Sequence, residues 1–427
     1  LGPMCVCVRM WSKRGVVSSI CRLPPTLVCV IASCASALAS GADLCGGIPI
    51  SEWTFSSGQQ SSGYHVVCFY VDGASCSDGD GVCSSSGGMT VDVHWDGSRS
   101  AETLSIQSPG SLLDLENELS KHHAPANLKR HDRIKRIVEK KGNAKGIYSF
   151  FSVPLTGGAP ERVRSVSDLR GLVLVFEGGA FIWPGVEVGF KREVNFSVKN
   201  SDNLVLELTT KSMTPLVIEI SNFLDESECN HVIKRASPHV KASSVSHMDH
   251  DVGKADTNWR TSNTHFLKSD DDIMRRLDWR VSALTLLGKD HQEPAQVLRY
   301  EEGQSYDAHH DFFNPDLYKK DQMVQGLTKK GLFNRLATVF FYLTSVEEGG
   351  ETNFPMAGGD GRPVKSFKDC SRGVSIQPER GRIIIFYSQL PSGQTDASSL
   401  HSGCPVKKGT KWSANKWVWN TRQTFTP

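Results

Sequence analysis

The residues best suited to chemistry lie in the motif His309-His310-Asp311, which follows an apolar run that ends at Tyr300. On a β-strand, residues i and i+2 point to the same face of the sheet. His309 and Asp311 are therefore expected to present an imidazole and a carboxylate side by side, whereas His310 points away. Such a pair supplies two ligands of a divalent metal site.

A third metal ligand is expected from a late strand or its edge, and His401 is the only histidine after residue 310. Two histidines and one carboxylate bind ferrous iron while leaving positions open for oxygen and a co-substrate. Each signal is weak alone, because both the motif and His401 are also compatible with solvated loops. The same His-x-Asp spacing occurs at His247-Met248-Asp249, in a polar stretch with no apolar strand before it.

Ten residues after His401 comes Lys411, between polar Thr410 and Trp412-Ser413. A lysine aimed into an apolar barrel needs a carboxylate partner, because an unpaired buried charge is unfavourable. A dicarboxylate such as 2-oxoglutarate supplies one: its 2-oxo acid end would chelate the metal, and its far carboxylate would meet Lys411. Tyr300 precedes the motif on an apolar strand and carries a hydroxyl that can hydrogen-bond the same carboxylate.

The elements that must position these residues are two helices followed by many short strands. One helix is predicted to begin at Asp225, with Glu228 at capping-box spacing, and another to run from about Ser269 to Leu287 with Gly288 as its C-terminal cap. The predicted strands are Leu216–Ile220, Ala295–Tyr300, Ala337–Leu343, Gly373–Gln377, Arg382–Tyr387 and Lys416–Trp419. This order predicts a mainly β fold with flanking helices, a double-stranded β-helix (jelly roll) with a ligand cavity between its sheets.

The N-terminal half carries weaker signals. Residues 146–213 are predicted to form a small β-rich accessory region before a catalytic domain over 214–427. Residues 41–145 are expected to be a Cys/Gly/Ser-rich region and basic linker, partly disordered. Within them, residues 121–145 contain nine Lys and Arg. That run fits an anionic partner or, more simply, a solvated linker or exposed helix.

Composition and charge bound the function classes. The 427 residues suggest two domains, and 39% hydrophobic with 22% charged residues fits a soluble globular protein. Lys and Arg number 48 against 46 Asp and Glu, so the overall charge gives no case for a nucleic-acid partner.

Residues 1–40 have the pattern of a signal peptide or signal anchor. Four basic residues precede an apolar run from Leu23 to Ala39, which ends in small residues. A buried helix or an arbitrary translated leader remains the alternative. Either secretory interpretation predicts the oxidising lumen of the endoplasmic reticulum or the secretory pathway, with membrane contact only through an anchor.

The cysteines agree with an oxidising compartment. Cys45, Cys68, Cys76 and Cys83 cluster and predict two disulfides, whereas a competing zinc site lacks any C-x-x-C pair. Cys370 and Cys404 flank the late strands, and a bond between them would brace the loop that carries His401. Two unpaired buried thiols are the open alternative.

Taken together, residues from about 214 to 420 resemble the catalytic domain of the prolyl 4-hydroxylase family. The matching stretches are Tyr300–Asp311, Arg335–Val339 through Glu347–Thr352, and Ser399–His401 through Gly409–Ser413. The resemblance implies that His309, Asp311 and His401 bind Fe(II) and that Lys411 with Tyr300 binds 2-oxoglutarate. It also implies that Arg335, Trp417 and Glu293 line the groove for the peptide substrate.

The implied reaction is hydroxylation of peptidyl proline at C4 with O2 and 2-oxoglutarate, releasing succinate and CO2. Ascorbate is implied as a supporting reductant, and a Pro-rich or hydroxyproline-type polypeptide as the substrate. The alternatives are a 2-oxoglutarate oxygenase with another substrate and an inactive peptide-binding module. Two departures bear on peptide preference: Trp419 stands where many relatives have His, and Asn314–Asn334 is longer than the loop of compact relatives.

Overall fold

The computed structural model describes residues 44–55, 62–69, 89–107, 109–140, 146–155, 157–196, 203–244, 259–358, 366 and 368–423. The expected targeting segment, Cys76, Cys83 and the His247-Met248-Asp249 motif lie outside these residues. None of the described helices is long and apolar enough to cross a membrane.

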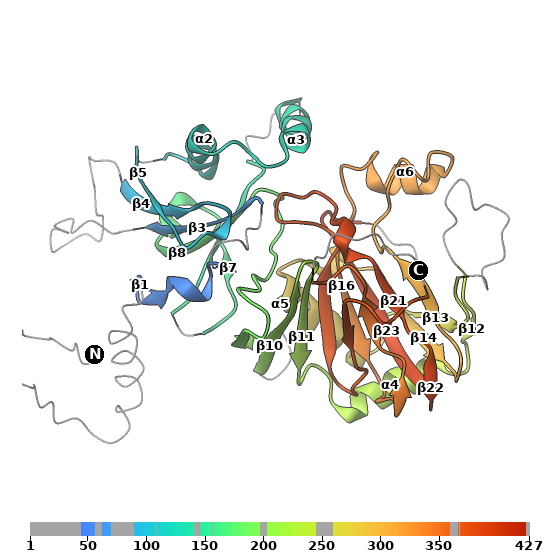
Figure 1. Ribbon diagram of the computed structural model, residues 1–427. Coiled ribbons are helices and arrows are strands. Elements are labelled where there is room, and N and C mark those ends of the chain that lie inside the picture. The colour runs from blue at the N-terminus through green and yellow to red at the C-terminus, as the bar shows by residue number, and fades with distance from the viewer. Residues whose placement is uncertain are drawn as a thin grey trace, which may run out of the picture. The chain divides into compact units, whose positions relative to one another are not determined.

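The C-terminal half, which the sequence predicts to be catalytic, is built on two antiparallel sheets (Figure 1). The larger sheet has nine strands, in the order β12 (Lys241–Ala242), β13 (Asn263–Leu267), β14 (Ala295–Tyr300), β23 (Lys411–Trp419), β16 (Arg335–Tyr342), β20 (Ile383–Tyr387), β11 (Leu216–Ser221), β10 (Leu204–Met213) and β9 (Lys191–Phe196). The smaller sheet has four, in the order β15 (Tyr306–His309), β21 (His401–Gly403), β18 (Thr352–Phe354) and β19 (Val374–Ile376). The two-stranded ladder of β17 (Glu348–Gly349) and β22 (Val406–Lys408) completes this half.

Both faces of the larger sheet are covered. Along β20, Ile384 and Phe386 join the core cluster that also holds residues of the smaller sheet, such as Phe354 and Ile376. The alternate residues Ile383 and Ile385 join a second cluster with apolar residues of α4 (Glu226–Ala236) and α5 (Asp272–Thr285). Alternate residues of β20 are therefore buried on opposite faces of the sheet, as expected for a central strand that is covered on both sides. The predicted jelly roll backed by helices is confirmed.

The predicted N-terminal cap of the first helix is confirmed, whereas the predicted C-terminal cap of the second helix is wrong. Asp225 caps α4, and the capping box with Glu228 is present. The cap predicted at Gly288 for α5 is wrong: the helix ends at Thr285, and Leu286 takes the left-handed conformation. Gly288 instead precedes the short helical turn Lys289–His291, so the chain has to leave α5 before it reaches this glycine.

The N-terminal half contains its own six-stranded sheet. Its order is β5 (Glu102–Ile106), β4 (Met89–His94), β3 (Tyr64–Phe69), β8 (Gly171–Phe176), β6 (Ser149–Ser152) and β7 (Glu161–Arg162), and α2 (Leu112–His122) and α3 (Leu128–Lys140) follow β5 in the chain. A short ladder joins β1 (Leu44–Cys45) to β2 (Ile48–Pro49), and a disulfide links Cys45 to Cys68. One of the two predicted disulfides in this cluster is thus found, and the other pair lies outside the described residues.

Two features of the sheets bear on the expected domain limits, which stay a prediction. Three strands of the six-stranded sheet precede residue 146, in the stretch expected to be a Cys/Gly/Ser-rich region and basic linker, partly disordered. The limit at 213 falls inside the hairpin of β10 and β11, and β9 with β10 extends the larger catalytic sheet. Leu206 and Leu208 of β10 are buried against that sheet's core, which explains why these strands belong to it.

A buried ion-pair network ties α4 to α5 and gives a test of the fold. The Glu228 side chain is 1% exposed, 3.1 Å from Arg276 Nε and 2.6 Å from Arg280 Nη1. Glu228→Ala should lower the free energy of unfolding by roughly 3–5 kcal/mol, because it leaves the guanidinium of Arg280, which is 11% exposed, without its carboxylate. In urea unfolding, Glu226→Ala on the same helix is the control; its side chain is 72% exposed, so its pair with Arg380 should contribute under about 1 kcal/mol. Equal losses in both variants would contradict this account.

Candidate metal and co-substrate site

Three predicted ligands meet on the smaller sheet. His309 ends β15, Asp311 lies two residues beyond it, and His401, the cross-strand partner of His309, begins β21. One ligand atom of each lies within 4.8 Å of the others, and no other such group of three His, Cys, Asp or Glu occurs in the described part of the chain. His309 Nε2 is 3.7 Å from Asp311 Oδ1, and His401 Nε2 is 3.5 Å from Asp311 Oδ2. This geometry can hold a divalent cation.

Backbone carbonyls orient both imidazoles. His309 Nδ1 lies 2.8 Å from the carbonyl oxygen of Asp307, and His401 Nδ1 lies 2.9 Å from that of Ser399. Since a carbonyl only accepts hydrogen bonds, each Nδ1 donates, and the lone pair of each Nε2 faces the cluster. His310 Nε2 bonds instead to the carbonyl oxygen of Ala397, so its side chain lies outside the ligand set, as the motif predicts.

The Asp311 carboxylate is held from the larger sheet. Thr338 Oγ1 on β16 donates to Asp311 Oδ2 at 2.6 Å, and Arg335 Nη1 donates to the Asp311 carbonyl oxygen at 3.1 Å. Burial alone would raise the pKa of Asp311, but the charges of His401, His309 and Arg335 and the Thr338 hydrogen bond lower it. Burial also lowers the pKa of His309. A metal cation requires an ionised carboxylate and neutral imidazoles, and the lowered pKa values of Asp311 and His309 favour these states in both residues.

Lys411 lies in the same core between the two sheets. It begins β23, is 1% exposed, and stands opposite Tyr300 on β14. Its Nζ donates to the Gly350 carbonyl oxygen at 2.6 Å and lies 5.4–5.8 Å from the ring centroids of Tyr300, Phe340 and Tyr342. Burial lowers the pKa of Lys411 to about 7, against an opposing effect of Glu351. An ammonium in an aromatic cage, without an ion pair to a described residue, fits a site for an anionic co-substrate.

The three residues expected to line the peptide groove also come together. Arg335 makes a bidentate pair with Glu293, at 2.6 and 2.9 Å, and its guanidinium carbon lies 3.7 Å from the ring centroid of Trp417. Trp419 Nε1 donates to Glu293 Oε1 at 2.7 Å. Because Arg335 also donates a hydrogen bond to the Asp311 carbonyl oxygen, the three residues expected to line the peptide groove border the predicted metal ligands.

Sequence reasoning missed Arg260, a 4% exposed arginine beside the metal ligands. It donates to Ser262 Oγ at 3.0 Å and to Gln296 Oε1 at 3.4 Å, and it lies 4.6 Å from the ring centroid of Tyr306. Tyr306 in turn stacks on His309 at 3.7 Å between centroids. The residues around Arg260 show no periodic apolar pattern. Only the β-bridge between Arg260 and Tyr306 shows that Arg260 lies at the site. Thr338 was also missed, because a threonine inside an apolar strand is common and gives no sign of a functional role.

The disulfide between Cys370 and Cys404 is present, with 6.1 Å between the Cα atoms. Cys404 follows β21, so the bond lies three residues from His401. The predicted pairing of Cys370 with Cys404 is confirmed. That the bond braces the segment carrying His401 stays a prediction.

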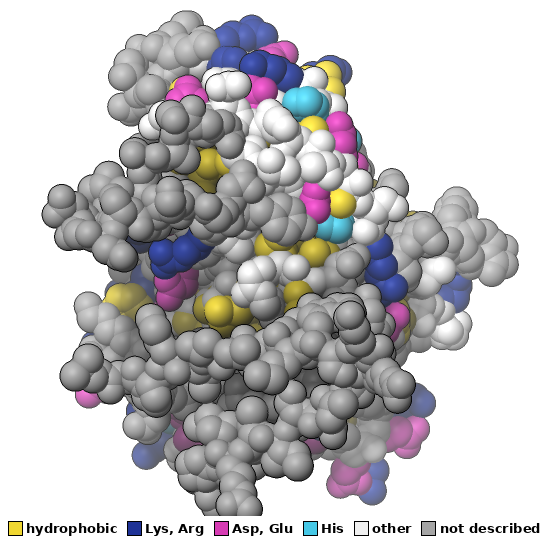
Figure 2. All heavy atoms as spheres, turned by 90° about the vertical axis from the view of Figure 1, so that its left-hand side faces the viewer, with side chains coloured by type: hydrophobic (Ala, Val, Ile, Leu, Met, Phe, Trp, Pro, Cys, Tyr) yellow, Lys and Arg dark blue, Asp and Glu magenta, His cyan; other side chains and the backbone are white. Residues whose placement is uncertain are grey.

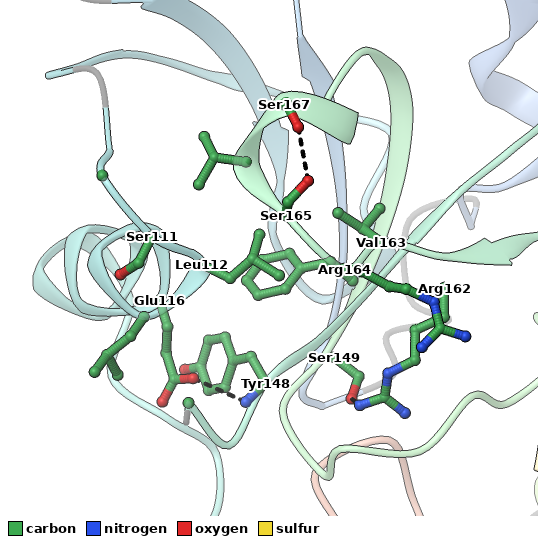
Figure 3. Close-up of a pocket in the computed structure, with 15 residues that line it drawn as sticks. Ser111, Leu112, Glu116, Tyr148, Ser149, Arg162, Val163, Arg164, Ser165 and Ser167 are labelled. Carbon is green, nitrogen blue, oxygen red and sulfur yellow. Dashed lines mark hydrogen bonds between the residues drawn. The ribbon is translucent and has the colours of Figure 1, made fainter. Parts of the chain in front are cut away.

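A separate cavity of about 690 Å³ lies in the N-terminal half, between α2, β6 and the segment after β7 (Figure 3). Its polar groups already bond one another: Arg162 donates to Ser149 Oγ, Ser165 donates to Asp168, and the Glu116 carboxylate accepts from two backbone amides. None of the three predicted metal ligands lines it.

The first test of the site concerns the metal. His309→Ala, Asp311→Ala and His401→Ala should each abolish stoichiometric Fe(II) binding, because each removes one of three protein ligands. His310→Ala is the matched control and should keep Fe(II) binding, since its imidazole contacts Ala397 instead. Metal stoichiometry of the purified variants measures this directly. Wild-type stoichiometry in His401→Ala would remove it from the ligand set.

Comparison with known proteins agrees with this geometry. Residues 295–419 match the family model of the 2OG-Fe(II) oxygenase superfamily. Probable prolyl 4-hydroxylase 3 of Arabidopsis thaliana is 38% identical over 213 residues, which cover 48% of this chain and 70% of that protein. Probable prolyl 4-hydroxylase 7 of the same plant is 38% identical over 275 residues, 63% of this chain and 78% of that protein.

Among solved structures, the chain is similar to the viral collagen prolyl hydroxylase of Paramecium Bursaria Chlorella virus-1, crystallised as its 2OG complex. The identity is 26%, the TM-score is 0.34, and the match covers 48% of this chain and 96% of that one. On the sequence matches, the chain belongs to the prolyl 4-hydroxylase family of Fe(II)- and 2-oxoglutarate-dependent dioxygenases.

Proposed function

We propose that the protein hydroxylates peptidyl proline at C4, consuming O2 and 2-oxoglutarate and releasing succinate and CO2. The observation that carries this proposal is the buried His309–Asp311–His401 group in one core with the buried Lys411. One oxygen atom of O2 enters the proline ring and the other enters succinate. Bound Fe(II) and 2-oxoglutarate supply the oxidising chemistry.

The chain's own residues bind, orient and shield. His309, Asp311 and His401 would hold Fe(II), with Thr338 and Arg335 fixing the carboxylate. Lys411 would bind the far carboxylate of 2-oxoglutarate by a charge-assisted hydrogen bond, with Tyr300 beside it. The rings around Lys411 exclude water, which strengthens that interaction.

A Pro-rich polypeptide is the substrate that we propose. Arg335 and Glu293 neutralise each other, and Trp417 offers an aromatic face beside them. A proline ring is uncharged and packs well on such a face. Arg260, whose described partners are all neutral, would donate to main-chain carbonyls of the bound peptide.

We also propose that the protein works in the endoplasmic reticulum lumen or the secretory pathway, with residues 1–40 as signal peptide or anchor. The disulfides Cys45–Cys68 and Cys370–Cys404 support an oxidising compartment. Ascorbate as a supporting reductant belongs to the same proposal and rests on family resemblance.

The pKa of Lys411 generates a pH prediction. Pairing with a carboxylate raises that pKa above its value of about 7 in the free protein, so 2-oxoglutarate binding takes up a proton at higher pH. The affinity should therefore be constant below pH 7 and fall by up to about tenfold per pH unit above it. Lys411→Arg keeps its charge and should remove this dependence. Anaerobic titration of the metal-loaded protein between pH 6 and 9 measures it; a wild-type affinity unchanged over this range would contradict the assignment.

The decisive test of function is 2-oxoglutarate decarboxylation with and without Pro-rich peptides, with hydroxylation read by mass spectrometry. Peptide-dependent turnover should add one oxygen atom to proline. Arg260→Ala should raise the peptide KM roughly tenfold, because the peptide loses its hydrogen bonds to a charged donor. The dissociation constant of 2-oxoglutarate should stay unchanged. Turnover stimulated only by lysyl peptides or small molecules would overturn proline as the target.

A further inference from the structure

The segment Asn314–Asn334, longer than in compact relatives, is a folded platform rather than an open loop. It carries α6 (Gln322–Thr328), whose Val324 packs in one buried cluster with Phe313, Tyr318 and Trp419. Gln325 Nε2 donates to the carbonyl oxygens of Pro315 and Tyr318. At its base, the Asn334 side chain bonds both the amide and the carbonyl of Phe313. These contacts hold the platform next to Arg335.

Helix α3 of the N-terminal half meets the far end of this platform. Arg133 donates through Nη2 to the Lys329 carbonyl oxygen at 2.7 Å and through Nη1 to that of Lys330 at 3.1 Å. These hydrogen bonds to main-chain carbonyls bring three cationic residues together, namely Arg133, Lys329 and Lys330. Lys and Arg side chains gather at the upper edge of the face shown in Figure 2, at the height of α2 and α3 in Figure 1.

These contacts create a basic patch, which we define as Lys129, Arg133, Arg136, Lys329 and Lys330. The first three recur at i, i+4 and i+7 on α3, so they form one stripe. Asp132, three residues after Lys129 and four before Arg136, is an exposed acidic residue at the border of this stripe. All five side chains are exposed. Within the described part of the chain, none of the five forms an ion pair, in contrast to the exposed Lys407 and Lys408, which pair with Glu348 and Glu347.

The backbone at the patch is also unusual. Lys329 and Lys330 have φ values of 46° and 57°, and Gly331 continues the left-handed run at 83°. Left-handed conformations are unfavourable for long side chains and are retained mainly where the surrounding structure requires them. Lys329 is the left-handed C-cap of α6, and both lysine side chains are exposed.

The patch lies close to the catalytic centre along the chain. Lys330 and Arg335 are five positions apart in the chain, a span of at most roughly 18 Å. Arg335 itself bonds the ligand Asp311. An extended peptide covers that distance in about five residues.

We infer that the basic patch binds an acidic stretch of the same polypeptide substrate, beginning about five residues from the target proline. This inference rests on the proposed function. The near balance of charge over the chain, 48 cations against 46 anions, favours a local contact of this kind over nucleic acid. Rim charges of this type act mainly on association and on specificity.

The test uses the full chain and two peptides with one Pro-rich core. One carries four Glu on each side, starting about five residues from the target proline, and the other carries Gln at the same positions. Wild-type kcat/KM should be roughly tenfold higher for the Glu peptide at low salt, with similar kcat, and the advantage should fade at high salt. Lys329→Gln/Lys330→Gln should remove most of it. The matched control Lys407→Gln/Lys408→Gln, also an exposed lysine pair, should keep it.

Equal kcat/KM for the Glu and Gln peptides in the wild type would overturn the inference while leaving the proposed function intact. If no peptide is hydroxylated, the proposed function fails, and fluorescence anisotropy of the labelled peptides still decides whether the patch prefers Glu. Patch-dependent binding to vesicles containing phosphatidylserine, without any peptide preference, would assign the patch to a membrane surface and also overturn the inference.

Discussion

The register of β23 between β14 and β16 is the constraint on which the site depends. It sets Lys411 opposite Tyr300 and Trp417 opposite Thr338. Side chains alternate along a strand, so Lys411 faces the inter-sheet core while its neighbour Trp412 joins the cluster under the helices. A slip by one residue would turn Lys411 out of the core and place an indole where the co-substrate's carboxylate is to bind.

The three proposed Fe(II) ligands lie at the smaller sheet, but the carboxylate among them is held from the larger sheet. Asp311 lies beyond the end of its strand, where a carboxylate would otherwise be free to turn. The hydroxyl of Thr338 and the guanidinium of Arg335, both on β16, hold its side chain and its carbonyl. Arg335 in turn is held by Glu293 and Trp417. The proposed metal ligands and the proposed peptide-binding residues are therefore joined by hydrogen bonds, and Glu293 is linked to Asp311 through Arg335.

The residues that the structure gathers at the candidate site were predicted more fully than the architecture around them. His309, Asp311, His401 and Lys411 are each weak signals alone, and the family resemblance singles them out as a set. Arg260 was not predicted, because its importance comes from a bridge to Tyr306 across 46 positions of sequence. The six-stranded sheet was underestimated for the same reason: β3 pairs with β8, about one hundred residues later, and neither strand reveals its partner locally. Local periodicity identifies strands, whereas sheet membership depends on contacts that no local window contains.

Trp419 links the two departures from the family pattern. A histidine there would titrate near neutral pH and change its hydrogen-bond donors as it did so. The indole Nε1 of Trp419 is a permanent donor to Glu293, so the Arg335–Glu293 pair keeps the same partner at every physiological pH. The same indole is 1% exposed and packs on Phe313, Tyr318 and Val324 of the long segment. Trp419 therefore supplies both a fixed polar contact to Glu293 and apolar surface against which Tyr318 and Val324 of Asn314–Asn334 pack. A histidine at position 419 would present less apolar surface to that segment, so the two features are physically connected.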